Sequence, residues 1–357
     1  TFHIRGKALH RKVSKFFPLL RDTAAAARID DLARLKEILL KHFTGMEGRL
    51  NQSALKYAIN LSASALNTAS KAANDLYGLN YFWMIRDLVK DFDKQGPYLL
   101  AKLQQIQKRV TCLEDPHLVL SCNAAMYNHL KTHSFYGLGE IEKSPSNPWK
   151  GALPITKIPP QGRVIASPVA FIGKVFPTVS YTHPDAPALT VASFLFDNLT
   201  LHSKIREQGG AYGGGAVSNP MSGNFYFYSY RDPNIVSTFK AFDEAVYHVV
   251  KGNIDESDLE EAKFEMIQGL DSPISPGSQA EVAYGWLQEK KNYAIRQAFR
   301  NKLLSLTCDQ VIDAIQRIII PNMSKGSEVV FAGRELLEQA NQELEAEGKS
   351  PLEIAVI

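Results

Sequence analysis

Cysteine is scarce in this sequence. Only Cys112, Cys122 and Cys308 occur in 357 residues, which is too few for a disulfide framework and is typical of a reducing compartment. No apolar run approaches the roughly 20 residues that a membrane-spanning helix needs. A formal net charge of +3 is too small to indicate a nucleic-acid partner. We therefore expect neither a membrane nor a nucleic acid among the partners.

Several catalytic signatures are also absent. The sequence contains no H-x-x-E-H or H-E-x-x-H, no nucleophile elbow, no Walker loop and no dinucleotide-binding fingerprint. His129 and His133 have the i,i+4 spacing that can bind zinc on a helix, but no carboxylate lies between them. A metal site there is one interpretation, and a solvated pair of histidines on a helix face is the favoured one.

The chain begins with Thr1 rather than Met, so we expect it to be processed or to be a piece of something longer. Residues 1–21 are basic, and no acidic residue precedes Asp22. This composition is compatible with a mitochondrial transit peptide. A strand at Phe2–Arg5 followed by a first helix is favoured, because apolar residues recur at helical spacing after it.

Two domains follow from composition and periodicity. Residues 1–136 are mostly helical in pattern, with a buried strand expected at His117–Cys122. Residues 137–162 have the composition of a linker, with five prolines among Ser and Gly. Residues 163–357 predict a second, α+β domain. Ile29–Lys36 faintly echoes Ile254–Lys263, as two copies of one domain design would.

The second domain has clear element patterns. We expect an antiparallel pair of strands in which Tyr226, Tyr228 and Tyr230 share one face of the second strand, while Phe225 and Phe227 share the other. The other expected elements are strands within 164–179 and at 328–332, and helices at 184–205, 233–250, after Asp255, 279–305, 307–319 and 335–345. The expected fold class is α+β, with two homologous domains that each pack a mostly antiparallel sheet against several helices.

A glycine-rich stretch joins the helix at 184–205 to the strand pair. Five of the seven residues in 209–215 are glycine, and the exceptions are Ala211 and Tyr212. A phosphate-binding loop is disfavoured, because this stretch leaves a helix C-terminus, where the dipole is negative. From the residues alone, Arg206 is a cation in the last helical turn and Tyr212 belongs to the core of a hairpin.

The segment Ile205–Gly215, which reads IREQGGAYGGG, resembles the arginine-to-tyrosine motif in the C-terminal half of insulinase-like (pitrilysin) zinc metallopeptidases. Its double glycine is similar to the branch that includes presequence protease and falcilysin. Ile4–Leu9, Ile29–Leu32 and the Ala/Ser-rich helix from Ser53 resemble the third domain of these enzymes. The resemblance covers nearly the whole chain.

This resemblance implies that the chain is domains three and four of a four-domain enzyme whose halves close over an unfolded peptide. Zinc, its ligands and the general base would lie in the N-terminal half, so no metal is expected in this chain. Tyr212 would donate to the oxyanion, since a phenol stays protonated until about pH 10. Arg206 would bind a substrate carbonyl, and Gly209, Gly210, Ala211 and Gly213 would lie against the substrate backbone.

Three functions remain in competition. The first is the substrate-clamping half of a zinc endopeptidase that degrades short unfolded peptides, such as cleaved targeting sequences, and that is inactive as this chain alone. The second is a non-catalytic scaffold or substrate-binding subunit of the same superfamily, and the third is an unrelated binding protein. Arg206 and Tyr212 together favour the first. Members of this branch occur in the bacterial cytoplasm, the mitochondrial matrix and plastids.

Overall fold

The computed structural model describes residues 3–111, 117–141 and 151–357. The chain forms two compact units, each assembled from separate segments. Unit 1 comprises Thr1–Thr44, Ile85–Gly151 and Pro273–Lys291, and unit 2 comprises Gly45–Met84, Ala152–Ser272 and Asn292–Ile357. Helices α2 (Leu32–Glu47) and α5 (Leu79–Lys90) contribute residues to both units.

The described residues of unit 1 form helices and loops. The small core of the unit joins Val13 and Phe17 of α1 to Leu130 of α7. Its elements are η1 (His10–Lys12), α1 (Val13–Ala25), α6 (Phe92–Thr111), α7 (Ala124–Thr132), η2 (Ser134–Glu140) and α11 (Gln279–Gln288). After α7, Ser134, Phe135 and Tyr136 have φ angles of 49°, 50° and 51°, in the left-handed region that costs about 1–2 kcal/mol per non-glycine residue.

Two strands expected from the sequence are wrong. The described part of Phe2–Arg5 and all of His117–Cys122 have no regular secondary structure. An apolar run forms a strand only where a partner strand is available, and unit 1 has none among its described residues. Leu118 is instead 47% exposed, while Leu120 packs against the small core.

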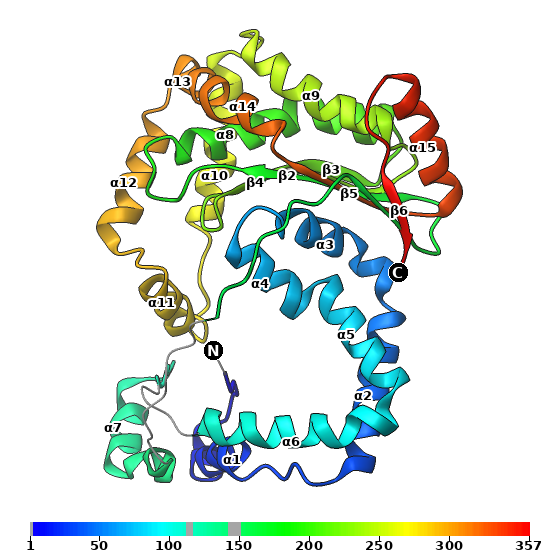
Figure 1. Ribbon diagram of the computed structural model, residues 1–357. Coiled ribbons are helices and arrows are strands. Elements are labelled where there is room, and N and C mark those ends of the chain that lie inside the picture. Colours follow the sequence, from blue (N-terminus) through cyan, green and yellow to red (C-terminus); the bar gives the residue numbers. More distant parts are fainter. Residues whose placement is uncertain (1–2, 112–116, 142–150) are drawn as a thin grey trace. The chain divides into compact units, whose positions relative to one another are not determined.

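Unit 2 is built on a six-stranded mixed sheet with the order β3-β4-β2-β5-β1-β6 (Figure 1). The β3–β4, β4–β2 and β2–β5 pairs are antiparallel, and β1 is parallel to both β5 and β6. The strands are β1 (Gln161–Val164), β2 (Ala170–Pro177), β3 (Gly213–Asn219), β4 (Asn224–Asp232), β5 (Ser327–Ala332) and β6 (Glu353–Val356).

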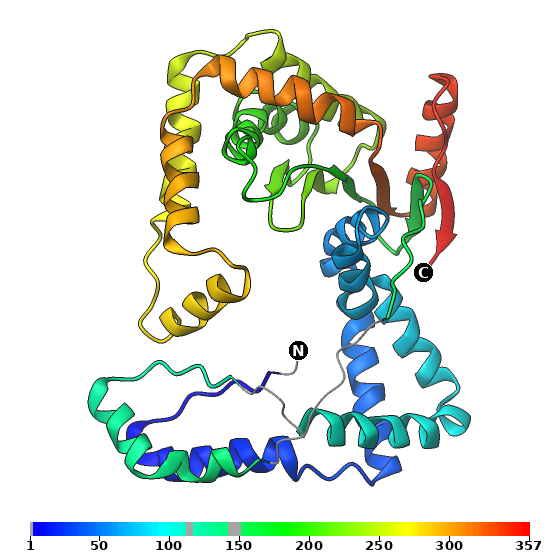
Figure 2. The ribbon, with the colours of Figure 1, turned by 60° about the vertical axis from the view of Figure 1, so that its left-hand side comes forward.

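Helices cover both faces of this sheet (Figures 1 and 2). On one face, α3 (Leu50–Ala63) crosses β2 so closely that a Cβ on Gly173 would lie 3.2 Å from the Ile59 nitrogen. The main core, which includes Phe176, Phe227 and Phe242, lies on the other face. The remaining helical elements of unit 2 are α4 (Thr68–Tyr77), α8 (Ala186–Phe196), η3 (Asp197–Gln208), α9 (Val236–Val250), α10 (Glu256–Leu270), α12 (Tyr293–Leu304), α13 (Cys308–Ala314), η4 (Ile315–Ile319), α14 (Ile320–Met323) and α15 (Arg334–Ala346).

The central strand β2 reads as a continuous apolar run because both of its faces are covered. It also carries a buried lysine, Lys174, whose ammonium lies 3.1 Å from the Glu328 carboxylate and 3.3 Å from that of Asp243. Burial alone would lower the pKa of Lys174, but the two carboxylates outweigh burial and raise it. The ammonium is therefore held charged inside the sheet layer.

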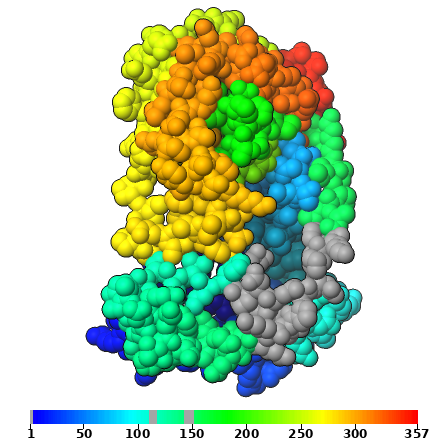
Figure 3. Space-filling model, turned by 90° about the vertical axis from the view of Figure 1, so that its left-hand side faces the viewer, coloured from blue at the N-terminus to red at the C-terminus, as the bar shows by residue number. Residues whose placement is uncertain are grey.

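A second packing contact joins the start of α8 to the C-terminal helices (Figure 3). The rings of Tyr181 and Phe299 stack with centroids 4.6 Å apart. At the surface, Arg317 of η4 lies 3.1 Å from the carboxylate of Asp185, the residue before α8. These contacts hold the N-terminal end of the α8–η3 helix in place.

The α+β fold class is confirmed, and the expected elements from residue 161 onward are present, with the tyrosine and phenylalanine faces of β4 as predicted. Strand β6 and the parallel pairs were not expected. Residues 45–84 pack with unit 2, although the sequence placed them in the first domain. The packing therefore does not follow a single boundary at residues 137–162, and the homology of two domains stays a prediction.

Candidate functional site

The turn at Gly209–Gly210 connects the end of η3 to strand β3. The Gly210 and Ala211 amides donate to the carbonyls of Arg206 and Ile205, at 3.1 and 3.0 Å. Gly210 has a φ of 78°, which glycine adopts without strain. A Cβ on Gly209 would lie 2.6 Å from the Ile205 carbonyl oxygen. Both glycines are therefore required for the chain to leave the helix and enter the sheet.

Arg206 lies in the last turn of η3 with its side chain exposed. Its Nη1 lies 3.3 Å from Nε2 of His202, one turn earlier. The other ring nitrogen of His202, Nδ1, lies 3.6 Å from the Glu207 carboxylate. His202 was not among the predicted site residues, although its i,i+4 spacing from Arg206 was a signal that could have identified it.

Tyr212 is 71% exposed, so placing it in the core of the hairpin was wrong. Its amide donates to the Arg231 carbonyl at 3.3 Å, which attaches it to β4. Its ring meets the ring of Tyr230 edge-on, with centroids 5.8 Å apart. The phenol is thus supported at its base by β4, while most of the side chain faces solvent.

Arg231 is a second residue that the sequence did not reveal. Strand β4 has a register shift against β2, where Phe171 pairs with Tyr230 and Ala170 pairs with Asp232, so Arg231 is the inserted residue of a β-bulge. Its φ is 51°, and its guanidinium lies over the Tyr230 ring, 5.5 Å from the centroid. No sequence pattern announces a left-handed arginine, because that region favours Gly and Asn.

The remaining glycines of the run have different neighbours. A Cβ on Gly214 would lie 2.8 Å from Ile205 Cγ2, and one on Gly215 would lie 3.0 Å from the Asp197 carboxylate. These two glycines let η3 approach β3. Ala211 is 4% exposed and belongs to the main core. Open space surrounds the Cα of Gly213, so Gly210 and Gly213 are the predicted substrate-contact residues with free space beside them.

Asp197, the first residue of η3, holds the edge of the sheet. Its carboxylate accepts the Ala216 amide of β3 at 2.6 Å. Burial raises the pKa of Asp197 to about 7, against the effect of this hydrogen bond and with a further contribution from Glu265. Burial and the Asp197 charge together raise the pKa of Tyr228, the residue opposite Gly215 on β4.

No cluster of three or more His, Cys, Asp or Glu side chains suited to a metal exists within residues 3–111, 117–141 and 151–357. His129 Nε2 lies 2.8 Å from the Tyr136 hydroxyl, and His133 Nδ1 lies 2.8 Å from the His129 carbonyl oxygen. The ring contacts among these three side chains occupy the exposed pair. The described residues do not fit the ligand set of a zinc enzyme, which needs at least three protein ligands.

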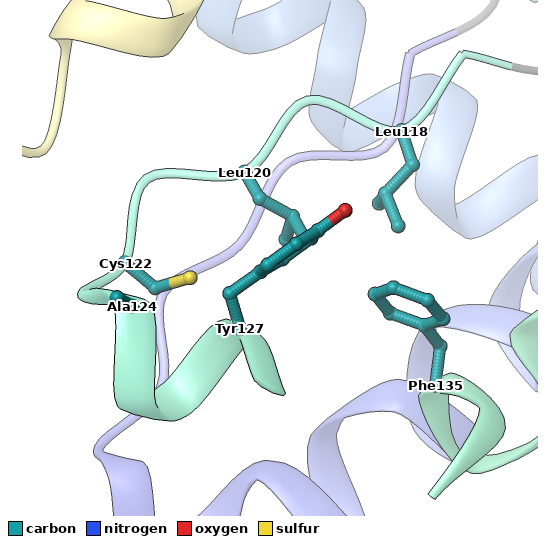
Figure 4. Close-up of a pocket in the computed structure, with 6 residues that line it drawn as sticks. All are labelled: Leu118, Leu120, Cys122, Ala124, Tyr127 and Phe135. Carbon is teal, nitrogen blue, oxygen red and sulfur yellow. The ribbon is translucent and has the colours of Figure 1, made fainter. Parts of the chain in front are cut away.

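An apolar pocket of about 600 Å³ lies in unit 1 (Figure 4). Leu118, Tyr127 and Phe135 point toward one another across it. Leu120, Cys122 and Ala124 complete the lining. The pocket contains none of the predicted site residues. Among the described residues, no helix is long and apolar enough to cross a membrane.

Comparison with known proteins agrees with the resemblance read from the motif. Residues 1–88 match a family of domains associated with subfamily C of the M16 peptidases, and residues 164–332 match the PreP C-terminal domain. The chain is 31% identical over 316 residues to the mitochondrial presequence protease of Yarrowia lipolytica, and this match covers 87% of the chain and 31% of that protein.

Two solved structures share the fold. A protease from Helicobacter pylori has a TM-score of 0.60 at 13% identity, covering 90% of this chain and 77% of that one. Pitrilysin has a TM-score of 0.57 at 14% identity, covering 97% of this chain and 36% of its own. The chain spans about a third of the length of the curated relatives it matches.

Proposed function

We propose that this chain, which belongs to the presequence-protease branch of the insulinase-like (M16) metallopeptidases, is the substrate-clamping half of a zinc endopeptidase acting on short unfolded peptides. The curated relatives are named mitochondrial presequence proteases, so we also propose a mitochondrial location. Zinc would be held by a separate N-terminal half and would activate the attacking water there. This chain alone would not hydrolyse peptides.

The observation that carries the proposal is the placement of Tyr212. A phenol that is 71% exposed, fixed through its own amide to β4 and adjoined by open glycine positions, suits a donor to a developing oxyanion. Arg206, exposed at the end of η3, has planar donors that suit a substrate carbonyl. A non-catalytic scaffold would have no need for this pair, which is the reason to prefer the enzyme.

The test is Tyr212→Phe in the full-length polypeptide that contains this chain and the zinc-bearing half. Removing one oxyanion donor lowers kcat by about 100- to 1000-fold. Zinc content should stay at the wild-type level, because no ligand changes. A kcat equal to that of the wild type would refute the donor role and favour the scaffold. Hydrolysis by this chain alone that persists after treatment with a chelator would contradict the assignment to a zinc enzyme.

A further inference from the structure

The β-bulge at Arg231 places a strained cationic residue directly beside Tyr212. The Arg231 carbonyl accepts the Tyr212 amide, and its guanidinium covers the Tyr230 ring that Tyr212 also contacts. These three side chains therefore form one contiguous group at the start of β3. Bulges are common next to active sites, where they re-aim a side chain.

The backbone of Arg231 is unusual for its residue type. With a φ of 51°, it is the one non-glycine residue with a positive φ among the described residues of unit 2. A left-handed conformation is unfavourable for a side chain as bulky as arginine, and such strain concentrates at binding and catalytic sites. Glycine or asparagine would adopt this bulge more readily, so the fold does not explain an arginine here.

The guanidinium of Arg231 is also uncommitted. Its side chain is exposed, and it forms no ion pair with any carboxylate in the parts of the chain that the structure describes. Its contact is with the face of Tyr230, which leaves the N–H groups at the guanidinium edge available. A planar fork of donors with a fixed charge matches a carboxylate, which it can bind through two parallel hydrogen bonds.

We propose that Arg231 is a specificity-determining residue that binds a carboxylate of the peptide substrate beside Tyr212. This inference rests on the proposed function, since it takes Tyr212 to lie at the cleavage site. The carboxylate belongs to the peptide C-terminus or to an acidic side chain. Both sources share one chemistry, and matched peptides separate them.

The experiment uses the full-length polypeptide and three versions of one peptide: a parent with one glutamate and a free C-terminus, the same peptide amidated, and the same peptide with glutamine for glutamate. Losing a charged hydrogen-bond partner costs about 10- to 100-fold in affinity. We expect one of the two altered peptides to lose that factor in wild-type kcat/KM, mainly through KM. Loss on amidation identifies the terminal carboxylate, and loss with glutamine identifies the side chain.

Variants of Arg231 then assign the preference. Arg231→Gln should abolish the discrimination between the peptides, and Arg231→Lys should retain part of it. Arg231→Gly should abolish it without lowering the melting temperature, because glycine relieves the left-handed backbone. Lys290→Gly is the matched control, since Lys290 is a cation with a φ of 56° outside this group, and it should leave the discrimination unchanged.

Equal kcat/KM for all three peptides in the wild type would overturn the proposal, as would a preference that persists in Arg231→Gln. Binding of the fluorescently labelled peptides, measured by anisotropy, provides a readout that does not depend on turnover. If Tyr212→Phe keeps full activity while the Arg231-dependent peptide preference is present, the donor role fails and carboxylate recognition stands. If Tyr212→Phe loses activity and no preference exists, only the present inference fails.

Discussion

The half-buried Asp197 carboxylate should make the fold less stable at alkaline pH, and Asp197→Asn should remove this effect. The pKa of Asp197 is raised from 3.8 to about 7 in the folded chain. Between these two values the folded state binds a proton that the unfolded state has released, so stability falls as pH rises from about 4 and stays low above about 7. This direction is opposite to that of an ordinary ion-paired aspartate.

The magnitude follows from the size of the shift. A change of about 3 pKa units corresponds to about 4 kcal/mol at about 1.4 kcal/mol per unit. Asp197 retains some contact with solvent, so we expect an effect on the order of 2 kcal/mol. The amide oxygen of asparagine can accept the same Ala216 amide. Asp197→Asn should therefore be more stable than the wild type by about 2 kcal/mol at pH 8, with the difference shrinking toward pH 4.5.

The assay is urea unfolding of both chains followed by circular dichroism at half-unit steps from pH 4.5 to 8. Asp271→Asn is the control with the opposite sign. Its hydrogen bond from Arg300 lowers the pKa of Asp271, so that variant should lose stability at pH 8 and lose less in acid. A difference between Asp197→Asn and wild type that does not vary with pH, or a variant less stable at pH 8, would refute the reasoning.

Two other predictions follow from packing. Gly214→Ala should destabilise the chain by about 1–3 kcal/mol through overpacking against Ile205, whereas Gly213→Ala, with open space around it, should leave the melting temperature unchanged and raise KM for peptides; equal melting temperatures would contradict the first half. Lys174→Ala should cost about 3 kcal/mol in urea unfolding, because the partly buried Glu328 and Asp243 lose their shared cation. A loss below about 0.5 kcal/mol would show that these charges are solvated.

The sequence predicted unit 2 better than unit 1, and the reason is physical. Strand β4 alternates tyrosine and phenylalanine, and α10 begins at an Asp255 capping box, so local pattern and tertiary contacts agree there. Residues 117–122 have an apolar strand pattern, but they line a pocket instead. A local pattern contains no information about whether a partner strand exists. For the same reason, the mixed order of the sheet and the packing of α3 on Gly173 could not be predicted.

The candidate site divides in the same way. Arg206 and Tyr212 were found because a helix end and a glycine run mark the turn between them. The neighbours of the glycines were not predictable, since only the folded chain shows that Gly214 meets Ile205 and Gly215 meets Asp197. Arg231 left no local signal, because its bulge arises from the register between β4 and β2. Side-chain roles that depend on register stay hidden in a single sequence.

The most direct test of the central claim is the affinity of a phosphinic peptide, whose tetrahedral anion mimics the oxyanion, for the full-length wild type and Tyr212→Phe. If Tyr212 donates to the oxyanion, the variant should bind this inhibitor about 100- to 1000-fold more weakly, in proportion to its loss of kcat/KM. The KM of the matching substrate peptide should change little. Equal inhibitor affinity in both proteins, together with a lowered rate or an unchanged one, would contradict the assignment of Tyr212 as the oxyanion donor.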